Sequence, residues 1–173
     1  MEQPTQDSWM TFGYPEDPEV LIAFGKLAIA HGHLDYALRL VVMTLAKVTK
    51  EQALDATNYD GAASLRERIK KFAKNRLGES PALVKVQALM SRCERVAKKR
   101  NDFIHSLWGR ELDGESFIYS KSKDWKSIPE SSELNKLVGE IEQLRNEIIR
   151  LVWKVVFCTW LSMKNSRACG LAL

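Results

Sequence analysis

The sequence has 173 residues, of which 45% are apolar and 28% are charged, so it is long enough for one well-buried core and short for two. Its five prolines and nine glycines are too few for a linker-rich or disordered protein. The net charge of +4 is uneven, because residues 66–100 carry twelve bases and three acids. Such a concentration suits a polyanionic partner, and two solvated helix faces are the alternative explanation.

We expect a single domain over residues 17–165, flanked by an acidic N-terminal tail (1–16) and a C-terminal tail (166–173). The chain does not open with a basic region followed by an apolar run, so a cytoplasmic protein without a signal peptide is expected. The apolar stretch at 148–163 is interrupted by two bases and is shorter than the roughly 20 residues of a membrane-spanning helix. Three cysteines with irregular spacing match neither a disulfide framework nor a metal-ligand pair.

The first predicted helix begins at Asp17-Pro18-Glu19, which combines a capping residue, a proline suited to the first helical position and an acid in the first turn. It should run to about Lys47. Apolar residues recur through it at alternating spacings of three and four, and this pattern predicts one buried stripe. The residues of this stripe are Phe24, Leu27, His31, Leu34, Leu38, Val41 and Leu45.

Two shorter helices are predicted next. The first covers about Glu51 to Ala56 and is followed by a turn at Tyr59-Asp60-Gly61. The second is a basic helix from about Ala62 to Arg76, and Gly78 should stop it.

A long helix should then open at Ser80-Pro81, which repeats the combination of a capping residue and a proline. It is predicted to continue through about Trp108, where Gly109 can provide a left-handed stop. Residues 109–130 break the helical pattern, and Asp113-Gly114 is a typical two-residue hairpin turn. We therefore expect a short hairpin or an ordered loop before the last helix.

Ser131 or Ser132 should cap the last helix, which is predicted to be about 30 residues long. From Ile148 onward, apolar residues cover most of its circumference, more than one neighbouring helix would bury. A homodimer through this helix or through the preceding long helix is therefore expected. The fold class predicted is all-α, a bundle of four main helices with a short hairpin or loop insertion. The stripe of the last helix comprises Leu134, Leu137, Ile141, Leu144, Ile148, Leu151, Val155 and Cys158.

Three histidines can be considered for chemistry one by one. His31 and His33 lie about 200° apart around their helix and cannot chelate one metal together. His31 falls in the apolar stripe with Asp35 one turn later, which fits a buried histidine bonded to that carboxylate. Asp35 could also line a pocket. His105, by contrast, closes the most basic stretch of the long helix.

Asn101 lies one turn before His105, so its amide can hydrogen-bond the imidazole and fix its tautomer. Asp102 is the other candidate for orienting the ring. Arg100 lies about 140° around the helix from His105. A substrate shared by these two residues would have to sit between them or meet copies supplied by a symmetry-related subunit.

The run Arg100-Asn101-x-x-x-His105, late in a long helix of an all-α chain, resembles the Arg-x(4–6)-His motif of the HEPN superfamily (higher eukaryotes and prokaryotes nucleotide-binding domains). The resemblance covers the helical architecture broadly and six residues specifically. It implies a HEPN-like bundle and an endoribonuclease that needs no metal and no cofactor, as in toxin–antitoxin, abortive-infection and CRISPR-associated phage-defence systems. It also implies a homodimer in which paired motifs form one cleft, and an antitoxin protein as a possible partner. Some HEPN toxins carry a modified tyrosine two residues after the histidine, where this chain departs from the pattern with Leu107.

The residue types fit this chemistry independently. RNA is cleaved without metal when a base takes the 2′-hydroxyl proton, the alkoxide attacks the adjacent phosphate, and an acid protonates the leaving 5′-oxygen. His105 can serve as either base or acid, and Arg100 can stabilise the charge that grows on the phosphate oxygens. Asn101, with Asp102 in support, would orient the histidine. The products would carry 2′,3′-cyclic phosphate and 5′-hydroxyl ends.

Residues that would contact RNA lie on both sides of His105. If residues 119–125 are extended, aromatic and basic side chains alternate on one face, as in single-stranded nucleic-acid binders, although an ordinary surface hairpin fits equally well. The RNA-binding residues predicted are Lys98, Lys99, Lys121, Lys123 and Trp125.

The function predicted from the sequence is thus a metal-independent endoribonuclease acting on single-stranded RNA at a dimeric site. Two alternatives remain. One is a non-catalytic HEPN-like module that binds nucleotide, nucleic acid or a protein partner through its basic helices. The other is a purely structural dimerisation bundle.

Overall fold

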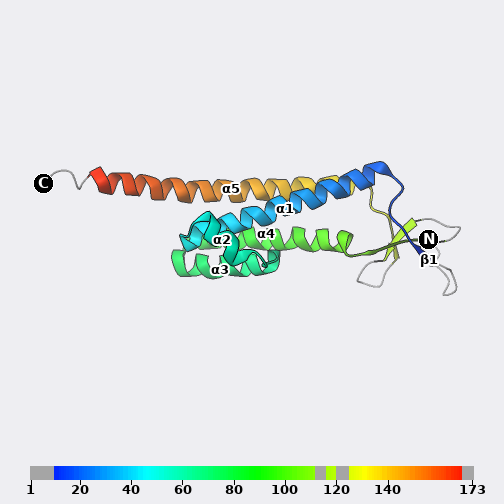
Figure 1. The fold of residues 1–173 in the computed structure, drawn as a ribbon, viewed down its shortest axis with the longest axis horizontal. Helices are drawn as coiled ribbons and strands as arrows, with labels where there is room; N and C mark the ends of the chain where they lie inside the picture. The colour runs from blue at the N-terminus through cyan, green and yellow to red at the C-terminus, as the bar shows by residue number, and fades with distance from the viewer. Residues whose placement is uncertain (1–9, 112–115, 120–124, 169–173) are drawn as a thin grey trace. The chain divides into compact units, whose positions relative to one another are not determined.

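The computed structural model describes residues 10–111, 116–119 and 125–168 (Figure 1). Helices make up most of this part of the chain, and the predicted all-α fold class is confirmed. The helices are α1 (Pro18–Ala46), α2 (Lys50–Thr57), α3 (Ala62–Leu77), α4 (Pro81–Ile104) and α5 (Ser131–Ala168). The strands are β1 (Met10–Phe12), β2 (Leu107–Glu111), β3 (Ser116–Tyr119) and β4 (Trp125–Ser127).

Three predicted helix boundaries, at Asp17, Gly78 and Ser80, are confirmed. Asp17 Oδ1 accepts a hydrogen bond of 2.8 Å from the backbone N–H of Glu19 at the start of α1. Ser80 Oγ likewise accepts one of 3.3 Å from Leu83 N–H at the start of α4. Gly78 ends α3 with φ of 54°, a left-handed conformation that glycine adopts at little cost.

The long helix ends earlier than predicted. We expected it to continue through Trp108, but α4 ends at Ile104 and β2 begins at Leu107. The reason is pairing over a distance: β2 pairs with β1 on one side and with β3 on the other. A strand that forms ladders on both edges satisfies its backbone groups better than one frayed helical turn does.

The expected hairpin is present and belongs to a larger sheet. β2 and β3 are antiparallel, with Gly109 opposite Phe117, and the turn predicted at Asp113-Gly114 lies outside the described residues. All neighbouring strands of the four-stranded sheet are antiparallel, in the order β1-β2-β3-β4. β1 lies in the segment expected to be a tail, because three residues are too few to show strand alternation in the sequence.

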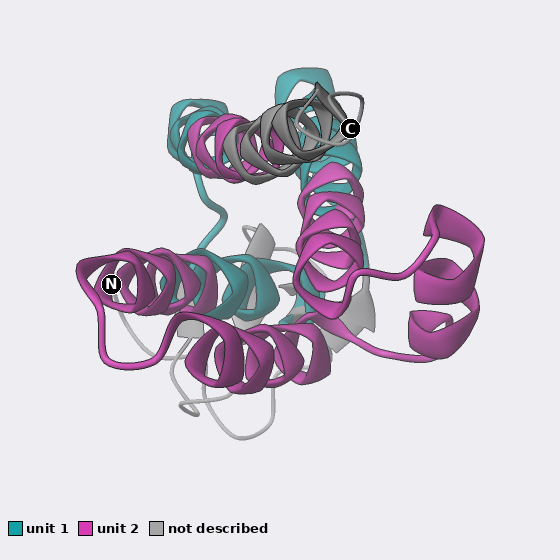
Figure 2. Cartoon of the chain, turned by 90° about the vertical axis from the view of Figure 1, so that its left-hand side faces the viewer, with its two compact units in different colours: residues 1–31, 95–141 teal, residues 32–94, 142–173 magenta. Residues whose placement is uncertain are grey.

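The chain divides into two compact units (Figure 2). Unit 1 comprises residues 1–31 and 95–141, and unit 2 comprises residues 32–94 and 142–173. The predicted single domain over 17–165 stays a prediction. Unit 1 buries Val20, Leu27, Val96, Leu134, Leu137 and Ile141, and unit 2 buries Leu34, Leu38, Leu65, Ile69, Met90 and Ile148.

Both predicted apolar stripes are buried where their side chains are described, with half-buried exceptions. In α1, Phe24 and His31 are half-buried, and in α5 the same holds for Leu151. The side chains of Val155 and Cys158 lie outside the described part. Among the described residues, no helix is long and apolar enough to span a membrane.

One ion pair joins α4 to α5 within each unit. In unit 1, Lys99 Nζ lies 3.0 Å from Glu140 Oε2. In unit 2, the Arg92 guanidinium donates to both carboxylate oxygens of Glu147, at 2.5 and 2.9 Å. The two hydrogen bonds hold the pKa of the Glu147 carboxyl below its usual range.

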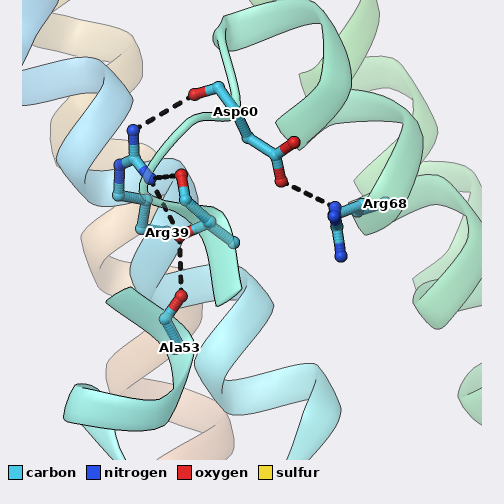
Figure 3. A network of polar contacts seen from close by, with 5 residues as sticks. Arg39, Ala53, Asp60 and Arg68 are labelled. Carbon is cyan, nitrogen blue, oxygen red and sulfur yellow. Dashed lines mark hydrogen bonds and ion pairs between the residues drawn. The ribbon is translucent and has the colours of Figure 1, made fainter. Parts of the chain in front are cut away.

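A polar network in unit 2 fixes the segment between α2 and α3 (Figure 3). The Arg39 guanidinium of α1 donates to the Thr57 carbonyl, to Thr57 Oγ1 at 2.8 Å and to the Asp60 carbonyl at 3.1 Å. Thr57 Oγ1 in turn donates to the Ala53 carbonyl at 2.7 Å. Arg68, a residue of α3, places its Nε 2.7 Å from Asp60 Oδ2. The start of α3 is therefore held by side chains from two helices.

Replacing Arg39 with alanine should lower the free energy of unfolding by about 1–3 kcal/mol, because the buried Thr57 side chain and two carbonyl groups would lose their donor. Urea unfolding measures this change. Arg95→Ala, which removes an exposed arginine, should stay within about 0.5 kcal/mol. Equal losses in both variants would show that the network contributes nothing specific.

Candidate nucleic-acid site at the end of helix α4

The candidate site lies where α4 gives way to β2. The backbone N–H of His105 donates to the Asn101 carbonyl at 3.0 Å, and Ser106 Oγ donates to the Asp102 carbonyl. These two bonds prolong the helical pattern just past Ile104. The backbone of His105 is therefore held by the end of α4, although His105 comes after the last residue of the helix.

Trp108 anchors the chain three residues after His105. Its indole Nε1–H donates to the Phe103 carbonyl at 3.2 Å. Its ring meets Phe24 of α1 edge to face, with ring centroids 4.9 Å apart and an interplanar angle of 84°. These contacts all belong to unit 1, so α1, α4 and β2 are joined beside the candidate site.

His105 is exposed, as a residue that transfers protons to or from a large substrate must be. Asp102 is exposed as well. Arg100 is half-buried, and its Nε–H group is buried with no acceptor in the described part of the chain. No acid among the described residues forms an ion pair with Arg100, whereas Arg68, Lys70, Arg92 and Lys99 each have one.

Asn101 is oriented differently from the sequence expectation. We expected its amide to hydrogen-bond the His105 imidazole, but Asn101 Oδ1 accepts a bond of 3.0 Å from Arg100 Nη1. Within the described residues, the Asn101 side chain makes no hydrogen bond to the His105 ring. The long arginine side chain can fold back on its neighbour, and the guanidinium is the stronger donor. The structure thus joins Asn101 to Arg100.

The lysines and aromatic residue predicted to bind RNA are only partly described. Lys98 and Lys99 are both exposed, but the Lys99 ammonium is engaged by Glu140. Lys121 and Lys123 lie outside the described residues. Trp125 is the first residue of β4, opposite Tyr119 of β3, and its side chain lies outside the described part. The proposed alternation of aromatic and basic side chains therefore stays a prediction.

Asp35 and His31 are both half-buried on α1, and each makes polar interactions. Asp35 belongs to unit 2, whereas the residues from Arg100 to His105 belong to unit 1. The supporting role of Asp35 stays a prediction.

Metal binding and thiol chemistry are two further chemistries that side chains in the described part of the chain could carry. No group of three or more histidine, cysteine, aspartate and glutamate side chains is arranged to hold a metal ion there. Cys93 is buried in unit 2, and this burial raises the pKa of its thiol to about 11. Cys93 is therefore a packing residue at neutral pH and is no nucleophile.

Comparisons of the chain with protein-family models, with curated proteins and with solved structures find no match. The HEPN resemblance consequently rests on the motif residues and on the helical architecture.

Proposed function

We propose that the chain is a metal-independent, HEPN-type endoribonuclease that cleaves single-stranded RNA. One observation carries the proposal: Arg100, the arginine of the motif, has no acid partner among the described residues and lies five residues before an exposed His105. An arginine whose charge is not matched within the protein can match a phosphate from outside. The exposed imidazole of His105 supplies a nitrogen that can accept or donate a proton in the reaction.

The proposed reaction uses the ribose itself as the nucleophile. A base removes the 2′-hydroxyl proton, the 2′-oxygen forms a bond to phosphorus, and the bond from phosphorus to the 5′-oxygen breaks. An acid gives the leaving oxygen a proton. His105 takes one of these two roles, and His105 of a second copy takes the other in a dimeric site.

Arg100 stabilises the additional negative charge on the phosphate oxygens in the transition state. Asn101 positions Arg100, because its amide oxygen accepts a hydrogen bond from Nη1 of the guanidinium. This contact limits the orientations of a flexible side chain before substrate binds. Asn101 is thus proposed as a positioning residue for the arginine, with Asp102 left to orient the histidine.

A second copy is part of the proposal. Trp153 on α5 is 68% exposed, and it lies in the section of that helix, from Ile148 onward, where the sequence is apolar on most sides. An exposed indole in such a section fits a surface that another subunit covers. Cellular RNA as substrate would place the enzyme in the cytoplasm, where a protein antitoxin could restrain it.

The test is to incubate purified protein with a mixed single-stranded RNA in EDTA and to map the ends of the fragments. We expect cleavage in chelator, with 2′,3′-cyclic phosphate and 5′-hydroxyl ends. Labelling with a kinase, with and without prior phosphatase, identifies the 5′ ends. Fragments with 5′-phosphates, or cleavage that requires added magnesium, would reject the mechanism. Tight RNA binding without any cleavage would favour the non-catalytic module.

A further inference from the structure

Helix α3 of unit 2 is the most basic helix of the chain for its length. Its 16 residues include six bases and one acid. Its inner side is apolar, with Leu65, Ile69 and Ala73 fully buried. The charges therefore gather on the outer side, where Lys70, Lys71 and Lys74 fall within one helical turn; we call these three residues the α3 lysine face.

Within the described residues, two of the six bases of α3 form ion pairs, and one of these two, Lys70, belongs to the lysine face. Arg68 Nε is 2.7 Å from Asp60, and Lys70 Nζ is 2.8 Å from Glu67. Lys71 and Lys74 are exposed and form no ion pair with any acid in the described part of the chain. The positive charge of α3 is thus concentrated towards its C-terminal half.

The stability of α3 does not explain this clustering. Lys70 and Lys74 are four residues apart, and Lys71 and Lys74 are three apart, so their Cβ atoms lie about 5–6 Å from each other. Like charges at these spacings destabilise a helix by a few tenths of a kcal/mol per pair. The helix dipole favours Lys74 near the C-terminus, but Lys70 and Lys71 lie too far from the end to gain from it.

We propose that the α3 lysine face binds the phosphate backbone of single-stranded RNA. This inference rests on the proposed ribonuclease function and adds to it a substrate contact in the unit that does not contain Arg100 and His105. Three lysines on one side of a helix offer several cations to a phosphate backbone at once, and each phosphate contact releases counterions. The exposed neighbours on the face, Glu67 and Asn75, offer no aromatic platform, so this contact is electrostatic and independent of base sequence.

The helix that carries the face is held at its start. Arg39 and Arg68 fix the segment that leads into α3 through the Asp60 carbonyl and carboxylate (Figure 3). A phosphate backbone that binds here would meet cations carried on a helix whose starting segment is already fixed, so little backbone entropy is lost on binding.

The test uses RNA that cannot be cleaved, so that binding is measured separately from chemistry. A fluorescent single strand of about 20 nucleotides with 2′-fluoro riboses lacks the attacking hydroxyl, and its anisotropy reports binding over a range of salt concentrations. The triple variant Lys70→Gln, Lys71→Gln, Lys74→Gln is compared with a control that loses the same charge elsewhere, Lys26→Gln, Lys85→Gln, Lys136→Gln. All three control lysines are exposed.

We expect the α3 variant to bind at least about tenfold more weakly at low salt, and the slope of log affinity against log salt to fall by about 2, near 0.7 for each lost phosphate contact. The control should change affinity less than about threefold. Circular dichroism checks that both variants are folded.

Equal losses in the two variants, or a wild-type protein that does not bind the probe, would overturn the proposal. A wild-type protein that binds polyglutamate more tightly than RNA, with the same loss in the α3 variant, would assign the face to an acidic protein and overturn it too. The nuclease proposal is tested apart from this, by the cleavage of ordinary RNA in EDTA by the wild-type protein. Tight binding of the 2′-fluoro strand with no cleavage of ordinary RNA would reject the nuclease and leave the lysine face standing.

Discussion

Replacing His105 or Arg100 with alanine is expected to lower RNA cleavage in EDTA by about a hundredfold or more in each case, because proton transfer and stabilisation of an oxyanion each contribute factors of that size. Neither change should unfold the protein, since His105 is exposed and Arg100 makes no ion pair with the described acids. Initial rates of cleavage of a labelled RNA, with protein stability measured in parallel, give the comparison.

The chain contains matched controls for both variants. Arg145 Nη2 donates to Asn146 Oδ1 at 3.1 Å on α5, the same local contact that Arg100 makes with Asn101. Arg145→Ala should leave cleavage within about twofold, because position 150 holds an arginine where the motif has histidine. His33→Ala, which removes an exposed histidine of α1, controls for His105. Cleavage that survives in His105→Ala would point to another residue or to a contaminating nuclease.

Replacing Trp108 with alanine is expected to lower the free energy of unfolding by about 3 kcal/mol, because the large half-buried ring packs against Phe24 and would leave a cavity. Cleavage should fall as well, since the strand that follows His105 would lose its anchor. Urea unfolding followed by far-ultraviolet circular dichroism measures the stability change.

Trp108→Phe separates the two contacts of the indole. Phenylalanine keeps the edge-to-face contact with Phe24 but cannot donate to the Phe103 carbonyl, so it should cost only about 1 kcal/mol. If the two variants were equally destabilised, the hydrogen bond rather than the ring packing would be the main contribution of this residue.

Local chemistry made most helix boundaries predictable. Asp17, Ser80 and Gly78 act at the positions where they were expected, because capping and left-handed backbone depend on a few neighbouring residues. The apolar stripes of α1 and α5 were predictable for a similar reason, since their spacing follows directly from the helical repeat.

Features that depend on distant residues were not predictable in this way. β1 exists because β2 pairs with it, and neither Met10–Phe12 nor its neighbours show that in their own pattern. The same pairing shortened α4 from the predicted end at Trp108 to Ile104. Within the candidate site, the motif pointed to Arg100 and His105. Whether the Asn101 amide bonds Arg100 or His105 depends on side-chain rotamers, which the sequence does not show. The anchoring role of Trp108 was not predicted. The one signal for it in the sequence is that a tryptophan stands three residues after His105.

The pairing of β1 with β2 also sets an order of events during synthesis. Met10 pairs with Glu111, so β1 must wait for about 100 further residues, or about 5–20 s at ordinary elongation rates, before its partner emerges from the ribosome. Closing so long a loop is also slow and entropically costly. The junction that holds His105 can therefore form only after both strands have left the ribosome, and β2 ends just six residues beyond the histidine itself.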